Sequence, residues 1–210
     1  MQMKSIKKKV YDVGINFGIW FLKKYFTEYF AAEPLQCTDR YVEYPFVLEN
    51  LPKPPCKVLD VGCSGSIFPY LISSIGYETT GIDIRNYYPT EKFFFVKGDI
   101  KTTMFDSGHF DVITAISSLE HIGLKGIYGI TEDDMDGDFV AVKEIHRILK
   151  PGGLFLMTVP YDEKLAIKHN HKIYTIDRIK MMLKDFKWEY KSVQSSEAEY
   201  KVCLAKAIKK

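Results

Sequence analysis

The stretch that decides the fold of this chain is Lys57-Val58-Leu59-Asp60-Val61-Gly62-Cys63-Ser64-Gly65-Ser66. Its apolar first half predicts a short buried strand, and its small residues predict a turn into a helix at about Pro69–Gly76. Small residues let a ligand approach the backbone closely, and the start of the helix offers free N–H groups and a positive dipole end. A strand, a glycine turn and a helix in this order open a nucleotide-binding α/β sheet.

A second strand is predicted at Tyr77–Ile84, and it ends in an acid, Asp83. Asp83 follows the glycine turn by about 20 residues, the spacing at which a carboxylate at a strand end accepts the hydroxyls of a ribose. The alternative is a solvated turn residue. The glycine turn and the acid together favour the ribose role.

The turn also separates two classes of cofactor. A dinucleotide calls for G-x-G-x-x-G, whose three glycine positions here hold Gly62, Ser64 and Ile67, so two of the three fail. Asp60 directly precedes the turn, and an acid there repels phosphates but suits a ligand with a cationic amino group. The residues therefore indicate S-adenosylmethionine, which joins adenosine to an amino acid and carries no phosphate.

Five segments in order resemble the motifs of class I S-adenosylmethionine-dependent methyltransferases: Val58–Ser66, Gly81–Arg85, Gly98–Ile100, Phe110–Ile122 and Leu149–Pro160. The resemblance runs from about Val47 to the end of the chain, and it includes a resemblance to small methyltransferases of polysaccharide and sugar pathways. The family usually has Gly-x-Gly-x-Gly after the first acid, whereas this chain has Gly62-Cys63-Ser64-Gly65-Ser66. Serine still permits close approach, so we expect cofactor binding with an altered turn.

The resemblance implies an α/β, Rossmann-like fold. Its seven-stranded sheet would be mostly parallel, with helices on both faces and an antiparallel last strand between the fifth and the sixth. The methyltransferase domain would cover residues 47–210, after an N-terminal helical lid or linker segment over residues 1–46.

The resemblance also implies a cofactor lying across the carboxyl ends of the first, second and fourth strands. Asp60 and the backbone of Gly62–Ser66 would hold its amino acid part, Asp83 its ribose and Asp99 its adenine amino group, although Asp99 could also be a plain loop carboxylate. The expected cofactor-binding residues are Asp60, Gly62, Cys63, Ser64, Gly65, Asp83, Ile84, Asp99, Ile100 and Ser117.

Three histidines are the candidate catalytic residues, because the pKa of an imidazole can lie near neutrality. His171 and His169 come first, since sequences that resemble this one place the segment after the fifth strand beside the acceptor. The alternative is a polar loop whose histidines only donate or accept hydrogen bonds. His121 follows the fourth predicted strand, Phe110–Ile116, and we favour it as a pocket-wall residue over a base.

No metal site is expected. The acidic loop Gly123–Asp138 fails the calcium pattern, because Lys143 stands where a bidentate glutamate is required, so it is interpreted as a solvated loop or an acceptor lid. His169 and His171 lack an evident third ligand.

The N-terminal part divides into two expected segments. Residues Met1–Phe30 are basic and aromatic, which predicts a helix that covers the pocket, contacts an anionic membrane surface or joins a homodimer. Residues Glu33–Pro55 contain five prolines and predict a linker. Within that linker, polar side chains at Arg40, Glu43 and Tyr44 are expected either to reach a ligand or to form a surface ion pair.

Composition narrows the function further. A formal net charge of +2 over 210 residues calls for no nucleic-acid partner, and four scattered cysteines indicate a reducing, cytoplasmic location. The sequence therefore predicts a methyltransferase, most simply an O-methyltransferase, acting on a hydroxyl of a sugar or another small polar acceptor. A non-catalytic S-adenosylmethionine-binding regulator or scaffold is the alternative, and a nicotinamide-dependent oxidoreductase is a weaker one.

Overall fold

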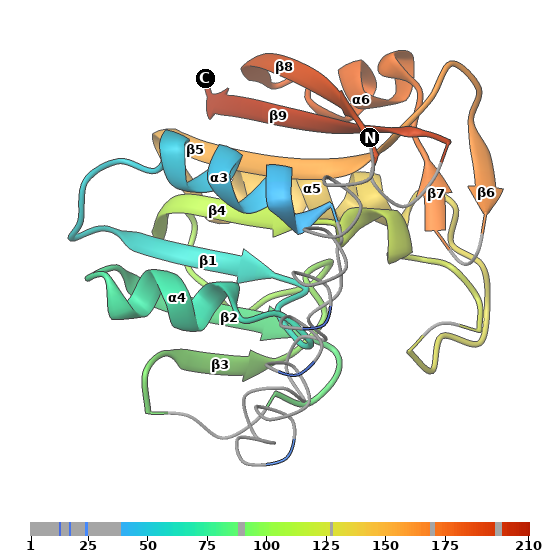
Figure 1. Cartoon of the computed structure of the whole chain (residues 1–210). Helices are drawn as coiled ribbons and strands as arrows, with labels where there is room; N and C mark the ends of the chain where they lie inside the picture. The colour runs from blue at the N-terminus through green and yellow to red at the C-terminus, as the bar shows by residue number, and fades with distance from the viewer. Residues whose placement is uncertain are drawn as a thin grey trace.

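A seven-stranded sheet organises the computed structural model, which describes residues 13, 17, 24, 39–87, 91–126, 128–168, 171–195 and 199–210. The strand order is β3-β2-β1-β4-β5-β9-β8 (Figure 1). The strands are β1 (Lys57–Val61), β2 (Glu78–Asp83), β3 (Phe94–Lys97), β4 (Phe110–Ile116), β5 (Leu149–Tyr161), β8 (Phe186–Gln194) and β9 (Lys201–Lys209).

Strand direction follows the prediction. The first five strands pair in parallel, and β9 lies antiparallel between β5 and β8. Strands β1 and β4 are buried along almost their whole length, as expected for parallel strands covered on both faces. The expected seven-stranded Rossmann-like sheet with an antiparallel last strand is confirmed.

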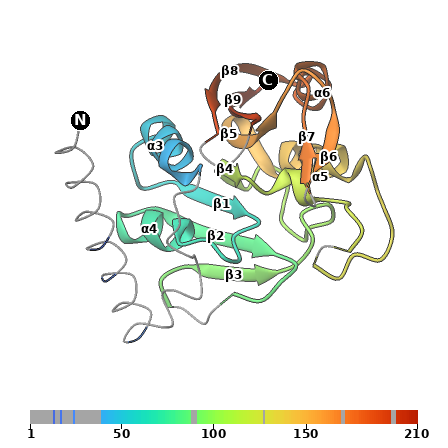
Figure 2. The same cartoon turned by 45° about the vertical axis from the view of Figure 1, so that its right-hand side comes forward.

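Helices cover both faces of the sheet (Figures 1 and 2). On one face, α3 (Arg40–Asn50) and α4 (Phe68–Ser74) supply buried side chains such as Val47 and Ile72 to one hydrophobic cluster. On the other, α5 (Gly137–Ile148) and α6 (Ile176–Met182) supply Ile145 and Ile179 to a second. The remaining elements are a 3₁₀ turn η1 (Leu119–His121) and a small hairpin of β6 (Ala166–Lys168) and β7 (His171–Ile173).

Residues 40–50 correct one expectation, because they form helix α3 rather than part of a linker. Pro45 lies inside this helix, where it removes an N–H donor and disfavours the helical backbone. Burial of Glu43, Phe46 and Val47 against the sheet outweighs that cost. The expected boundary between residues 46 and 47 thus falls within α3.

Most of the segment 1–30 lies outside the described residues, so the pocket, membrane and homodimer alternatives for it remain predictions. Within the described part of the chain, no helix combines the length and the apolar character needed to cross a bilayer.

The start of β5 also differs from expectation. The sequence predicts a strand over Leu154–Val159, but β5 begins at Leu149 and includes Pro151 and Gly152. Leu149 pairs with Phe110, the register then shifts, and Leu154 pairs with Val112. The Pro-Gly-Gly segment is therefore an irregularity within one long strand, at which Gly152 takes a φ of 72°.

Candidate functional site

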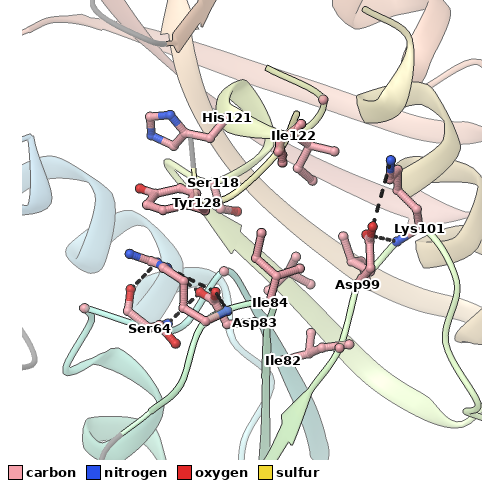
Figure 3. Close-up of a pocket in the computed structure, with 18 of the residues that line it drawn as sticks. Ser64, Ile82, Asp83, Ile84, Asp99, Lys101, Ser118, His121, Ile122 and Tyr128 are labelled. Atoms are coloured by element: carbon pink, nitrogen blue, oxygen red, sulfur yellow. Dashed lines mark hydrogen bonds and ion pairs between the residues drawn. The ribbon is translucent and has the colours of Figure 1, made fainter. Parts of the chain in front are cut away.

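The carboxyl ends of β1, β2, β3 and β4 meet at one edge of the sheet and border a cavity of about 350 Å³ (Figure 3). Parallel strands bring their carboxyl ends together, and ligands of open α/β sheets bind there. The loop that follows η1, here named the closing loop, also lines the cavity with Tyr128, Ile130 and Glu132. The site therefore lies where the sequence predicts it.

The turn after β1 needs glycine at two places. Gly62 and Gly65 have φ values of 75° and 87°, which L side chains rarely adopt. A Cβ built on Gly62 would lie 2.5 Å from the Cβ of Ser118, at the end of β4. The backbone of the turn is thus held against β4, and Gly62, Ser64 and Gly65 all line the cavity.

Asp83 ends β2 with its carboxylate at the cavity. Its Oδ2 accepts a hydrogen bond from the backbone N–H of Ser64 at 2.9 Å. The Arg85 guanidinium forms an ion pair with the same carboxylate at 3.0 Å. Only 4% of the Asp83 side chain is exposed, so this pair is largely shielded from solvent.

A more open carboxylate, Asp99, lies at another side of the cavity after β3 (Figure 3). Its Oδ1 accepts the backbone N–H of Lys101 at 2.8 Å, and 45% of its side chain is exposed. The Lys101 ammonium lies 3.8 Å from Asp99 and 3.1 Å from Asp134 of the closing loop. Asp99 therefore keeps acceptor capacity toward a ligand group that donates hydrogen bonds.

The closing loop is anchored at both ends by a buried lysine whose role the sequence did not predict. Lys172 donates to the carbonyls of Ile122 and Met135, at 2.9 and 3.1 Å, and lies 3.5 Å from Asp138. Burial lowers its pKa, although Asp138 opposes that shift. The acidic segment is thus fixed over the cavity, and the described residues hold no cluster of acids, histidines and cysteines suited to a metal.

A second unexpected feature is a pair of buried glutamates behind the cavity. Glu43 of α3 accepts hydrogen bonds from Ser117 and Thr158 and pairs with Arg40. Glu120 of η1 is fully buried, and that burial, with repulsion from Glu43, raises its pKa to about 8. The two glutamates are 77 positions apart in the sequence, and no local pattern predicts that they are buried near each other.

The candidate histidines come partly together. His121 lines the cavity, and its ring centroid is 6.2 Å from that of His171 on β7. Tyr128 packs on His121 and Tyr200 on His171, so the rings form one row. His169 lies outside the described residues.

The predicted cofactor residues divide into two groups. Those that line the cavity are Gly62, Ser64, Gly65, Asp83, Ile84, Asp99, Ile100 and Ser117. Asp60 and Cys63 are buried behind the turn instead. Asp60 accepts a hydrogen bond from Thr114 at 2.6 Å, and Cys63 packs against Gly81 with its thiol pKa raised by burial.

Comparison with known proteins identifies both a family and a fold. The sequence model of the family described as "Caenorhabditis protein of unknown function, DUF268" matches residues 94–210. The sterol 24-C-methyltransferase erg6 of Schizosaccharomyces pombe is 28% identical over 197 residues, which covers 83% of this chain and 48% of that protein. The sterol 24-C-methyltransferase ERG6B of Gibberella zeae is 33% identical over 129 residues, which covers 52% and 30%. The chain thus spans about half, or less, of the length of these relatives.

A solved structure shares the fold. The 1,6-didemethyltoxoflavin-N1-methyltransferase of Burkholderia thailandensis, solved with S-adenosylhomocysteine, superimposes with a TM-score of 0.60. It is 17% identical and covers 98% of this chain and 89% of its own, so the likeness shows the fold. By sequence and fold, the expected relationship to class I S-adenosylmethionine-dependent methyltransferases is confirmed.

Replacing Gly62 by alanine tests the turn. We expect Gly62→Ala to lower the free energy of unfolding by about 3 kcal/mol, from the positive φ and the overlap with Ser118. Gly152→Ala is the matched control, because Gly152 has a similar φ but nothing within 4 Å. Urea unfolding would measure both. A Gly62→Ala/Ser118→Gly variant should recover part of the loss, and equal losses at Gly62 and Gly152 would contradict the steric argument.

The buried Glu120 predicts a pH dependence of stability. Between its ordinary pKa of 4.5 and about 8, the folded state holds a proton that the unfolded state has released. Stability therefore falls as the pH rises through this window, by up to about 1.4 kcal/mol per pH unit. Glu120→Gln should remove that decline, with exposed Glu49→Gln as the control. Unfolding curves at pH 5, 6, 7 and 8 that show the wild-type slope in Glu120→Gln would contradict the assignment.

Proposed function

This chain belongs to the family described as "Caenorhabditis protein of unknown function, DUF268" and to the class I S-adenosylmethionine-dependent methyltransferases, and we propose that it methylates a small polar acceptor at a hydroxyl group. The observation that carries the proposal is the single cavity at which the glycine turn after β1, Asp83 after β2 and Asp99 after β3 converge. The acceptor, a sugar or another small metabolite, is the finer part of the proposal.

The cavity fits S-adenosylmethionine in its chemistry. The small residues of the turn after β1 leave the backbone open to the amino acid part of the ligand. Asp83 would accept the ribose hydroxyls, and the half-exposed Asp99 would accept the adenine amino group, which only donates. When bound, S-adenosylmethionine supplies a methyl group carried on a sulfonium.

The protein contributes mainly alignment and exclusion of water. The loop anchored by Lys172 borders the cavity and would limit water at the reacting atoms when cofactor and acceptor are bound. At the acceptor side, the imidazole of His171, or that of the cavity-lining His121 beside it, would accept the proton that a hydroxyl loses. Arg40 and Glu132 also line the cavity, and such polar groups favour a polar acceptor.

A second candidate function follows from the relatives. Two of them are sterol 24-C-methyltransferases, as their names state, which favours methylation of a carbon atom. Methyl transfer to an alkene carbon leaves a carbocation that must lose a C–H proton, so a histidine would then accept that proton in place of a hydroxyl proton. The described cysteines, Cys56, Cys63 and Cys203, are free thiols, in keeping with the proposed reducing, cytoplasmic location.

Calorimetric titration tests the cofactor. S-adenosylmethionine and S-adenosylhomocysteine should bind with micromolar dissociation constants, and NAD should not bind. Asp99→Ala should weaken the binding of both adenosyl ligands by about tenfold, because the hydrogen bond to the adenine amino group is lost. Exposed Asp106→Ala is the control for removal of a carboxylate. Tight binding of NAD, or no binding of either adenosyl ligand, would contradict the proposal.

Transfer of a labelled methyl group to a panel of sugars, small hydroxylated metabolites and sterols tests the acceptor. A His121→Ala/His169→Ala/His171→Ala variant should lose about 10²-fold or more in rate on a hydroxyl acceptor while binding S-adenosylhomocysteine normally. His146→Ala, on α5 against Phe186, is the control. Undiminished turnover would rule out base catalysis, a sterol product would favour carbon methylation, and no transfer with intact binding would favour a regulatory role.

A further inference from the structure

Hydrogen-bond donors of the protein itself occupy the lone-pair positions of the Asp83 carboxylate. Oδ1 accepts the backbone N–H of Arg85 at 2.8 Å and its Nε–H at 3.1 Å. Oδ2 accepts the backbone N–H of Ser64 at 2.9 Å and the Arg85 Nη2–H at 3.0 Å. A carboxylate offers about four lone-pair positions, so all of them are in use.

Two of these four hydrogen bonds come from backbone N–H groups, of Ser64 in the turn after β1 and of Arg85 after β2, which cannot leave without moving the main chain. The other two come from the Arg85 guanidinium, one on each carboxylate oxygen. A guanidinium presents two N–H donors in a planar fork, and the adjacent hydroxyls of a ribose likewise present two donors. Arg85 therefore occupies the places that the cofactor ribose needs.

The guanidinium is also held from its other side by the closing loop. Its central carbon lies 4.1 Å from the ring centroid of Tyr128, within the range of a cation–π contact. Arg85 donates to the carbonyl of Ser64 as well. Tyr128 and Asp83 thus lie on the same side of the cavity (Figure 3), joined through Arg85.

Resting on the proposed function, we propose that Arg85 is an internal competitor of the cofactor ribose and a determinant of cofactor affinity. Binding requires its guanidinium to leave Asp83 before the two ribose hydroxyls can donate to that carboxylate. About a third of the Arg85 side chain is exposed, so it can move toward solvent. Because Arg85 also contacts Tyr128, its displacement releases the closing loop from Asp83.

The decisive experiment compares wild-type protein with Arg85→Ala by calorimetric titration with S-adenosylhomocysteine. Arg85→Ala should bind about tenfold more tightly, because charge-assisted hydrogen bonds no longer have to be broken. Arg147→Ala is the matched control: Arg147 pairs with Glu144 on α5, outside the cavity, and its loss should leave the affinity unchanged. The affinity for adenosine should rise by a similar factor in Arg85→Ala. The affinity for 2′,3′-dideoxyadenosine should not change, because this ligand lacks the two hydroxyls that compete with Arg85.

A second measurement needs no ligand. Trypsin can cleave after Lys125, an exposed residue of the closing loop, and mass spectrometry can follow that cleavage separately from cleavage at residue 85. Loss of the contact between Arg85 and Tyr128 should accelerate it about two- to fivefold in Arg85→Ala. An unchanged rate would overturn the assigned link between Arg85 and the loop.

The failures are distinguishable. If wild-type protein binds S-adenosylhomocysteine and Arg85→Ala binds it equally or more weakly, Arg85 is no competitor and the inference falls while the proposed function stands. An equal gain for adenosine and 2′,3′-dideoxyadenosine would also overturn competition for the hydroxyls. If neither protein binds S-adenosylhomocysteine, the proposed function falls, and the inference with it.

Discussion

The site depends on the close approach of the turn after β1 to the end of β4. Strands β1 and β4 are hydrogen-bonded neighbours in register from Val58 and Val112 to Asp60 and Thr114. At the end of this register the backbone of Gly62 meets Ser118, and no side chain fits between them. That contact fixes the glycine turn after β1, and this turn presents the Ser64 N–H to Asp83. The side of the cavity that we propose for the cofactor is thus an extension of strand pairing.

The side of the cavity that we propose for the acceptor has a different origin, because side chains from distant parts of the chain hold it together. Glu43 of α3 accepts hydrogen bonds from Ser117 after β4 and from Thr158 of β5. Lys172 of β7 donates hydrogen bonds to carbonyls at both ends of the closing loop. Buried charges of this kind are costly unless fully paired, so loss of one partner is expected to disturb several segments together. The closing loop and the helix before the sheet are therefore coupled to the site by polar contacts.

The named relatives bear on the identity of the acceptor. This chain shares with the sterol 24-C-methyltransferases a segment that covers less than half of each of them. The match to the Schizosaccharomyces pombe relative covers 83% of this chain, so the similarity extends beyond the glycine turn and its neighbouring strands. Folds of this kind carry many substrates, so similarity over the fold does not by itself identify the acceptor.

The sequence by itself predicted the first strands and the candidate residues at their ends, and the resemblance to class I methyltransferases implied the seven-stranded sheet with its antiparallel last strand. Hydrophobic runs, the glycine turn and the spacing to Asp83 are local signals, and the parallel fold then brings the strand ends together. Only the tertiary structure decided that residues 40–50 are helical despite Pro45, since burial against the sheet supplies the stabilisation. It also decided the roles of Lys172, Glu120 and Arg85, because pairing across distant segments, desolvation and competition for one carboxylate leave no periodic trace in a sequence.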